Sequence, residues 1–447
     1  MSHGRMSIGL HFHPVGTHPA SWLCSDAPAG AEVSIDYYAE VARIAESGAL
    51  DFMFFADVPA MRDGNMAASR RWPLYAAQFE PVTLLGALAA STRRLGLAAT
   101  VSTSFYEPYN LARQFASLDH LSKGRVAWNV VTTSSGAAAF NFGRNPRQEH
   151  AQRYERAREF LAIVKGLWDS WDDDAFPRDK ASGVFFDPGK LHRLDFNGKH
   201  FAVRGPLNVP RSPQGHPVII QAGGSETGKA FAAETAEVAF TTESSLAGAQ
   251  KFYADLKGRL PGFMRTEDQL KILSGLKPIL GMTKTEAEDK FDRLQRHIHP
   301  DVGREILSID LDGVDLSDVP LDSPIPDDKI PKDVEGGKSY FGYLRKLMDN
   351  GPITVRQLYE IYAPARGGNF IVGTPKDIAD MMEEWFVGKA ADGFMIGLAY
   401  VPCDARLFVE HVVPALRRRG LFRLAYEGAT LRDHLGLARP VSRYASR

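Results

Sequence analysis

The chain has 447 residues, of which 44% are hydrophobic and 24% are charged, and its formal net charge is −1. This near-neutral charge, without a long basic run, argues against nucleic acid as the main partner. The two cysteines, Cys24 and Cys403, lie in no CxxC or Cys/His cluster, so neither a disulfide framework nor a structural zinc site is expected. No stretch approaches eighteen uninterrupted apolar residues and the N-terminal segment lacks a signal-peptide core, which predicts a cytoplasmic protein without a membrane span.

Short apolar runs alternate with amphipathic helical segments along the chain. The runs predicted as strands are 7–12, 52–56, 95–101, 125–131, 218–221, 238–240, 270–276 and 394–398. The main predicted helices are 34–47, 83–91, 111–121, 151–171, 226–234, 248–259, 286–296, 375–386 and 405–417. Strands that alternate with helices favour a parallel sheet, and for one chain of this length closure into a barrel is the economical solution. The sequence therefore predicts a single α/β domain over residues 1–447, a TIM (β/α)₈ barrel with insertions.

Two stretches interrupt this pattern. Residues 172–217 are rich in Asp, Gly, Pro and aromatic residues and have no helical period. Residues from about 297 to 368 include the acidic, proline-rich string DLDGVDLSDVPLDSPIPDDKIPKDVEGG, which is predicted not to pack as a core element. A long irregular segment inside a compact domain is typically a lid, a binding loop or a disordered excursion. The residues alone leave a lid over 297–368 and an inert excursion equally open.

Candidate functional residues follow the predicted strands, because TIM-barrel active sites lie at the C-terminal ends of the strands. In chain order these candidates are His11, His13 and His18 after the first run, Asp57 after the second, Thr103 and Ser104 after the third, Asn129 in the fourth, His150 and Tyr154 at the next helix start, and Gly223, Gly224 and Ser225 after the fifth run.

The turn after the fifth strand has a clear physical meaning. Gly223 and Gly224 allow the backbone to approach a ligand closely, and Ser225 is a good helix cap. The free N–H groups and positive dipole end of the following helix would bind a phosphate. An ordinary capped turn is the commoner explanation when this motif is taken alone.

The other candidates carry weaker signals. His150 and Tyr154 lie four residues apart, so both could reach one ligand, although such pairs are more often packed or solvated. Asp57 directly follows a buried run, where a carboxylate is costly unless it is functional or paired with an arginine. His11 and His13 share a strand face, but the acidic partners typical of hydrolytic metal barrels are missing nearby, so no metal site is predicted.

Three common catalytic signatures are absent from the sequence: a GxSxG nucleophile elbow, a GxGxxG after the first strand and a GxxxxGK[ST] loop. Their absence argues against a serine hydrolase, a Rossmann dehydrogenase and a P-loop NTPase. The residues alone therefore predict a phosphate-binding α/β barrel and leave its reaction open.

A series of uncommon strings then indicates a family. They occur in order between about residues 6 and 435 and include FMFFAD, EPVTLLGALAASTRRLGLAATVSTSFYEPYNLAR, LDHLSKGRVAWNVVTTSS, RYERAREF, HPVIIQAGGSETG, PLDSPIPDD and FIVGTPKDIADMMEEWF. In these strings the sequence resembles the bacterial luciferase-like flavin monooxygenases. More narrowly, it resembles the branch that contains the nitrilotriacetate, EDTA and dibenzothiophene-sulfone monooxygenases and one of the subunits of pristinamycin synthase.

The resemblance implies a TIM-like barrel that binds FMN without a covalent bond and receives reduced FMN from a separate NAD(P)H:flavin reductase. It implies that O₂ forms a C4a-(hydro)peroxyflavin, which transfers one oxygen atom to a small organic substrate. It further implies a lid over 297–368 and a homodimer or homotetramer. The implied FMN contacts are Asp57, Thr103 and Asn129 near the isoalloxazine, and His150, Tyr154, Gly224 and Ser225 toward the ribityl chain and phosphate. His11 and His18 are the candidates for proton management.

One departure bears on the substrate. Members of this branch often carry an arginine just after the tryptophan of the first strand–helix loop, whereas Leu23 follows Trp22 here. This difference speaks against a polycarboxylate, and Phe12, Trp22, Phe105 and Phe140 are predicted to form a pocket for a sulfur or aromatic compound. Two alternatives stay open: an F420-dependent oxidoreductase of the same superfamily, and a flavin-binding barrel without turnover.

Overall fold

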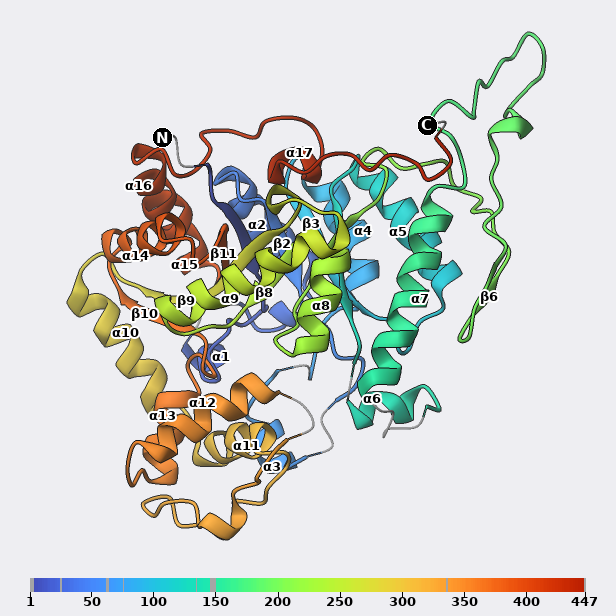
Figure 1. Ribbon diagram of the computed structural model, residues 1–447. Helices are drawn as coiled ribbons and strands as arrows, with labels where there is room; N and C mark the ends of the chain where they lie inside the picture. The colour runs from blue at the N-terminus through green and yellow to red at the C-terminus, as the bar shows by residue number, and fades with distance from the viewer. Residues whose placement is uncertain are drawn as a thin grey trace.

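The computed structural model describes residues 4–24, 26–61, 64–74, 76–133, 135–144, 150–334 and 337–445, without the side chains of His150 and Ser339. Within these ranges, eight parallel strands close into a barrel in the order β1-β2-β3-β4-β7-β8-β9-β11, with β11 paired to β1 (Figure 1). The barrel strands are β1 (Ser7–His11), β2 (Phe52–Phe55), β3 (Gly96–Ser102), β4 (Val126–Val131), β7 (Val218–Gln221), β8 (Val238–Thr241), β9 (Lys271–Leu280) and β11 (Gly393–Gly397). The predicted TIM barrel and all eight predicted strands are confirmed.

Helices cover the outside of the barrel and follow the strands in the usual alternation. They are α2 (Ile35–Ser47), α4 (Pro81–Ser91), α5 (Pro108–Ser122), α7 (His150–Trp168), α8 (Glu226–Thr235), α9 (Leu246–Arg259), α14 (Pro375–Val387), and α15 (Cys403–Leu407) continued through a π-helical turn (Phe408–Val412) into α16 (Val413–Arg418). Helix α2 begins where the Ser34 hydroxyl accepts the Tyr37 N–H, and α4 begins with a proline at its first position. None of the described helices is long and apolar enough to cross a membrane.

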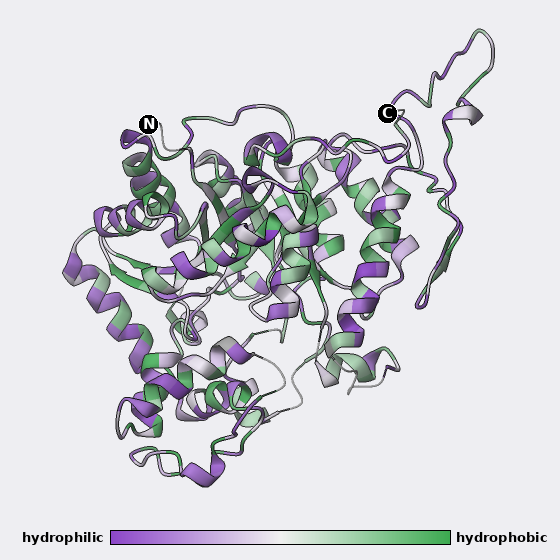
Figure 2. Ribbon diagram, viewed as in Figure 1, coloured by the Kyte–Doolittle hydropathy of each residue, from purple (hydrophilic) through white to green (hydrophobic). Residues whose placement is uncertain are grey.

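Alternating strand residues divide the core into two regions. One set points outward and packs under the helices, which gives the large cluster around Trp128, Phe115 and Phe160. The other set fills the barrel interior, where Phe52, Phe54 and neighbours form a separate cluster. In Figure 2 the hydrophobic colour is accordingly concentrated on the strands and on the inner faces of the helices. A filled interior leaves the end of the barrel as the place for a ligand.

The N-terminal end of the barrel is closed by the C-terminal segment. Leu431 and Leu435 of α17 (Leu431–Leu435) pack on the interior cluster. Arg432 binds Glu237 through two hydrogen bonds of 2.6 and 2.9 Å, and Arg423 binds the fully buried Asp51. Both chain ends lie on this side in Figure 1, and the opposite, C-terminal side of the strands faces the short helices α1 (Ser21–Cys24), α3 (Met66–Ser69) and α6 (Gly136–Asn141).

The first insertion, residues 172–217, is as irregular as predicted. It contains a short 3₁₀ turn (Pro188–Lys190) and the two-residue strands β5 (Phe196–Asn197) and β6 (Ala202–Val203). Figure 1 shows part of it as an arm that projects away from the barrel beside α7. Trp171 anchors the arm through ring contacts with Phe176 and Phe186, at centroid distances of 4.5 and 5.3 Å.

The second insertion, residues 297–368, is termed the mouth lobe. The prediction that its acidic, proline-rich string cannot form core was wrong, because the lobe contains α11 (Pro300–Asp310), α12 (Lys338–Asp349) and α13 (Val355–Tyr362) around a hydrophobic cluster of its own. Leu311, Leu316, Val319 and Ile325 come from the acidic string and are at most 6% exposed. Single apolar residues between the aspartates and prolines were sufficient for burial, although they follow no regular period.

The mouth lobe is joined to the barrel by strand pairing as well as by the connecting segments of the chain. β9 is ten residues long: its first half pairs with β8 and β11, and its second half pairs with β10 (Asn369–Gly373), which the sequence did not reveal as a strand. Helix α10 (Lys284–Arg296) leads from β9 into the lobe and β10 leads back. In Figure 1 the lobe helices lie at the C-terminal end of the strands, where α3 contacts α11.

Candidate functional site

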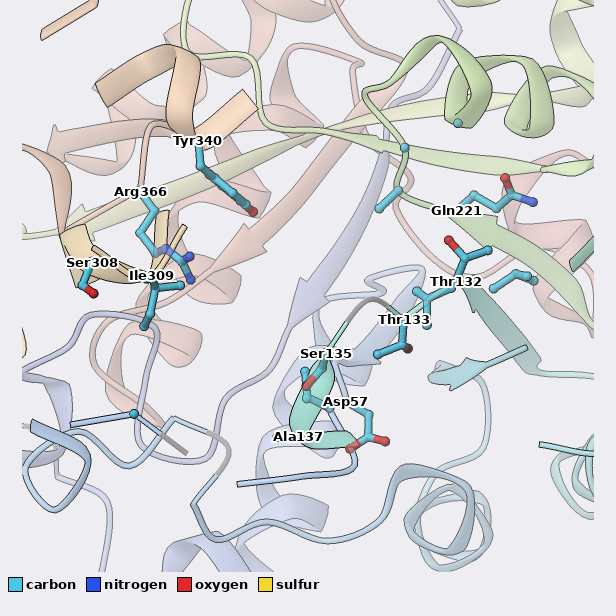
Figure 3. A pocket seen from close by; sticks show the side chains of 18 of the residues that line it. Asp57, Thr132, Thr133, Ser135, Ala137, Gln221, Ser308, Ile309, Tyr340 and Arg366 are labelled. Carbon is cyan, nitrogen blue, oxygen red and sulfur yellow. The ribbon is translucent and has the colours of Figure 1, made fainter. Parts of the chain in front are cut away.

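A cavity of about 930 Å³ lies between the C-terminal end of the barrel and the mouth lobe. Its size is at the upper end of the range for small-molecule sites. Strand ends contribute Asp57, Val131 and Gln221, and the start of α8 contributes Gly223 and Gly228. The lobe contributes Ser308, Ile309, Tyr340 and Arg366, and Figure 3 shows these side chains facing the barrel residues across the cavity.

The turn after β7 forms one wall of this cavity. The Ser225 hydroxyl accepts the Gly228 N–H at 3.1 Å and caps α8, as its position in the sequence predicted. A side chain at Gly228 would lie 3.0 Å from the Tyr154 hydroxyl and 3.1 Å from the Ser225 hydroxyl, so these two hydroxyl groups meet beside the first turn of α8. A helix N-terminus with two converging hydroxyls and no intervening side chain provides donors for an anion.

The strand β4 brings a buried amide to the same end of the barrel. The Asn129 Nδ2 donates to the Thr100 hydroxyl at 2.9 Å, whereas its Oδ1 is buried and has no hydrogen-bond partner. Buried polar atoms are nearly always paired, so an orphaned acceptor indicates a missing donor. Val130 and Val131, which follow Asn129 on the strand, line the cavity.

Asp57 lies in the cavity wall at the end of β2. Burial and the nearby carboxylate of Glu80 raise the pKa of Asp57 to about 6. Its nearest side-chain hydrogen bond is a long one, from the Gln78 amide to Oδ1 at 3.4 Å. Among the described residues, a neutral amide takes the place of the arginine partner that the sequence left open, and no arginine bonded to Asp57 is seen there.

On the lobe side, Arg366 is held by a carboxylate. Its Nη2 donates to Oδ1 of Asp310 at 2.6 Å and its Nε donates to Oδ2 at 3.0 Å, while the Tyr362 hydroxyl donates to Oδ2 at 2.8 Å. The Tyr340 ring lies 5.0 Å from the guanidinium carbon, in cation–π geometry. This cluster ties α11 and α13 together where the lobe faces the barrel.

The comparisons with known proteins agree with this geometry. The luciferase-like monooxygenase family model matches residues 17–393. The chain is 47% identical over 442 residues to N-acetyl-S-(2-succino)cysteine monooxygenase of Bacillus subtilis, with 99% of this chain and 98% of that protein covered. It is 45% identical over 447 residues to nitrilotriacetate monooxygenase component A of Aminobacter aminovorans, with coverages of 99% and 98%. The chain belongs to the luciferase-like monooxygenase family.

A solved structure supports the same assignment. Riboflavin lyase (RcaE), solved with modified FMN and the substrate riboflavin, has a TM-score of 0.87 to this luciferase-like chain at 31% identity, and the match covers 98% of both chains. The resemblance to flavin-dependent monooxygenases predicted from the ordered strings is confirmed. These relatives favour an oxygenase over the F420-dependent and non-catalytic alternatives.

The histidines of this luciferase-like chain have distinct surroundings. Both ring nitrogens of His18 are engaged, with Nε2 3.2 Å from Oε1 of Gln295 and Nδ1 accepting the Ala20 N–H at 3.1 Å, so the ring joins the N-terminal segment to α10. His11 faces the barrel interior, 5.5 Å from the Phe54 ring centroid. Burial, His13 and Lys277 lower the pKa of His11 to about 3. His11 is not among the residues that line the cavity, and His18 has no free ring nitrogen for a substrate.

The cavity brings together some of the sequence-predicted contacts and not others. Asp57 and Tyr154 line it, whereas Gly224, Ser225 and Asn129 are not among the lining residues. Ser225 is hydrogen-bonded to the lining residue Gly228, and Asn129 directly precedes the lining residue Val130. Thr103 is 1% exposed and its hydroxyl donates to the Val131 carbonyl at 3.1 Å, so it supports the wall from behind. The His150 side chain lies outside the described residues.

The predicted aromatic substrate pocket was wrong. None of Phe12, Trp22, Phe105 and Phe140 lines the cavity. Phe12 packs outside the barrel against Tyr38 and Phe55, and Phe140 is 68% exposed. Residues that the sequence did not single out, Gln221, Phe231, Tyr340 and Arg366, line the cavity instead. The last residue of β7 was available as a strand-end signal for Gln221, whereas the lobe residues have no comparable motif.

Proposed function

We propose that this chain is the oxygenase component of a two-component system that uses reduced FMN and O₂ to oxidise a small sulfur- or nitrogen-containing compound. The observation that carries this proposal is the cavity that combines the α8 phosphate turn with polar strand ends under the mouth lobe. Support for the substrate class comes from two relatives, whose names specify a thioether, N-acetyl-S-(2-succino)cysteine, and an amine, nitrilotriacetate.

The residues around the cavity fit FMN. The N–H groups at the start of α8, with the hydroxyls of Ser225 and Tyr154, would hold the phosphate. The orphaned Oδ1 of Asn129 would accept a hydrogen bond from a ring N–H of the flavin. His150 remains a predicted contact toward the phosphate or ribityl chain, and Thr103 remains a predicted contact toward the isoalloxazine.

The protein itself has three tasks in this proposal. Bound FMN supplies the redox and oxygen chemistry, as cofactors do in such enzymes. The strand-end residues orient the flavin ring, and the α8 turn fixes the other end of the cofactor. The mouth lobe acts as a lid that excludes water from the flavin and holds the substrate beside it, with Arg366 and Tyr340 on its inner surface. His11 remains the predicted candidate for proton management, and its low pKa means that the ring would act as a neutral hydrogen-bonding group.

A separate NAD(P)H:flavin reductase is the proposed source of reduced FMN. Support comes from the relative named nitrilotriacetate monooxygenase component A and from a similar chain that is named as one of the subunits of pristinamycin IIA synthase, since both names describe one part of a larger system. A homodimer or homotetramer remains the proposed assembly.

The proposal is tested by following oxygen. Purified protein is loaded anaerobically with photoreduced FMN, mixed with ¹⁸O₂ and a panel of thioethers and amines, and the products are analysed by mass spectrometry. We expect one ¹⁸O atom in a product and the second in water. Reduced F420 supplied in place of FMN serves as the comparison. Tight binding and oxidation of F420, with no ¹⁸O in any product, would overturn the oxygenase proposal.

A further inference from the structure

We propose that Lys277, together with His11 and His13, forms a subsite for a carboxylate group of the substrate at the mouth of the barrel. The inference rests on the proposed monooxygenase function and adds a chemical requirement to it. It also reverses the expectation that the missing arginine after Trp22 argues against an acidic substrate, because the positive charge is supplied from a different strand.

The strand register places Lys277 and His11 on either side of a gap. His11 of β1 pairs with Gly397 of β11, and Leu276 of β9 pairs with Ile396, so Lys277 is level with Gly397. A side chain at Gly397 would lie 3.5 Å from Cγ of Lys277. In this row the lysine therefore lies beside the space over Gly397, which it shares with the Thr17 side chain, whose Cγ2 would be 3.3 Å from a side chain at Gly397.

The polar groups of this row lack partners of their own. In the described part of the chain, Lys277 has no hydrogen bond and no carboxylate within ion-pair distance, although it is only partly exposed. Both ring nitrogens of His13 are buried without a hydrogen-bond partner. An unpaired ammonium in a semi-enclosed site is costly, and two unpaired ring nitrogens beside it add to that cost. A bound carboxylate would satisfy the lysine and a histidine N–H together.

The electrostatics of the row suit a carboxylate at neutral pH. Burial and the neighbouring Arg366 lower the pKa of Lys277 to about 8, so its ammonium form still predominates at pH 7. Burial and the charge of Lys277 lower the pKa of His13 to about 4, and the pKa of His11 is lowered to about 3. Both rings are therefore neutral and offer an N–H donor, while the single positive charge comes from the lysine.

The position of Lys277, His11 and His13 in the barrel indicates that the anion bound there would belong to the substrate and not to the cofactor. The proposed flavin contacts Asp57, Asn129 and Gly223 belong to β2, β4 and β7, whereas Lys277 and His11 lie on the remaining arc β9-β11-β1. Lys277, His11 and His13 are not among the residues that line the cavity, but Arg366, which does line it, is close enough to Lys277 to lower its pKa. Arg366 itself already binds Asp310, whereas Lys277 has no carboxylate partner among the described residues.

The experiment compares a charged and a neutral ligand on the FMN-loaded protein. The probes are 2-(methylthio)succinate and its diamide, followed through the change in the absorbance of bound oxidised FMN. We expect the wild type to bind the dicarboxylate at least tenfold more tightly than the diamide. In Lys277→Met this preference should fall below threefold, and Lys277→Arg should restore it. Lys271→Met is the matched control, because Lys271 lies on the same strand about 20 Å away at the closed end of the barrel.

The pH dependence provides a second readout. In the wild type the preference for the dicarboxylate should fall by up to tenfold per pH unit above about 8, whereas Lys277→Arg should retain it to pH 9.5. The other groups facing Lys277 are His11, His13, His18 and Arg366, and none of them changes charge in this range.

The outcomes separate this inference from the proposed function. FMN dissociation constants are measured for every variant without the probes. If FMN binds the wild type but the dicarboxylate and diamide bind equally, the subsite is refuted and the monooxygenase proposal stands. If Lys277→Met weakens FMN tenfold and leaves the preference for the dicarboxylate intact, the lysine serves the flavin and the subsite is likewise refuted. If FMN does not bind the wild type, the proposed function itself fails.

Discussion

The sharpest test of the proposed phosphate turn is Ser225→Ala. The Ser225 hydroxyl accepts the Gly228 N–H at 3.1 Å and would donate its own hydrogen to the FMN phosphate. Removing a hydrogen bond to a charged group costs about 1.5–3 kcal/mol. The dissociation constant of FMN, measured by quenching of flavin fluorescence, should therefore rise roughly 10–150-fold, since each 1.4 kcal/mol is a factor of ten.

The substitution also removes a helix cap, and the chain contains a control for that effect. Ser245 caps α9 with the same spacing, its hydroxyl accepting the Gly248 N–H at 3.2 Å, and it follows β8, outside the proposed phosphate turn. Both Ser225→Ala and Ser245→Ala should lower the free energy of unfolding in urea by about 1 kcal/mol. Only Ser225→Ala should weaken FMN binding. Equal FMN affinities for the two variants would refute the assignment of this turn to the phosphate.

Three further predictions concern the cavity and its cover. Burial raises the pKa of Asp57 to about 6, so the folded state binds the proton more tightly than the unfolded state does. Asp57→Asn should therefore stabilise the protein above pH 6, by no more than about 3 kcal/mol at pH 8. Urea titrations at a series of pH values should show that this gain vanishes toward pH 4. Asp310→Ala leaves Arg366 unpaired and should destabilise the mouth lobe by about 3–5 kcal/mol, which faster proteolysis of the lobe would show. The control is Asp322→Ala, which removes an exposed ion pair with Arg356 and should leave the rate of proteolysis unchanged. Shortening the mouth lobe, residues 297–368, should uncouple FMN oxidation from product formation, and peroxide release equal to that of the wild type would exclude a lid.

The fold was predictable because its signal is local and repeated. Each barrel strand is a short apolar run with a polar strand end, and helix starts such as Ser34 and Ser225 carry a side-chain cap. The same logic placed Asp57 in the cavity wall, since the carboxyl ends of parallel strands meet at one end of the barrel.

The remainder depended on contacts between distant segments. The lobe helices do carry an amphipathic period, as the buried Val355, Leu358, Tyr359 and Tyr362 of α13 show, but the acidic, proline-rich string between α11 and α12 has none. That string hid the lobe's core, and β10 is only five residues long and partly buried. In the sequence, Lys277 is an ordinary polar residue in a strand. Its proposed role in binding a carboxylate follows only from the strand register, which sets it level with Gly397. Phe12 and Phe140 were grouped by aromatic type, whereas the alternation of β1 turns Phe12 away from the barrel interior.

The branching of β9 has a consequence for how such enzymes diverge. The first half of this strand pairs with the barrel strands β8 and β11, and its second half pairs with β10. The two segments that lead into and out of the mouth lobe therefore both start from paired strands at one place on the closed barrel. Residues between these segments can be lengthened, shortened or replaced while the ladder beneath them is preserved. The turn at α8 belongs to a different part of the barrel, so changes in what the lobe admits leave the proposed phosphate site untouched.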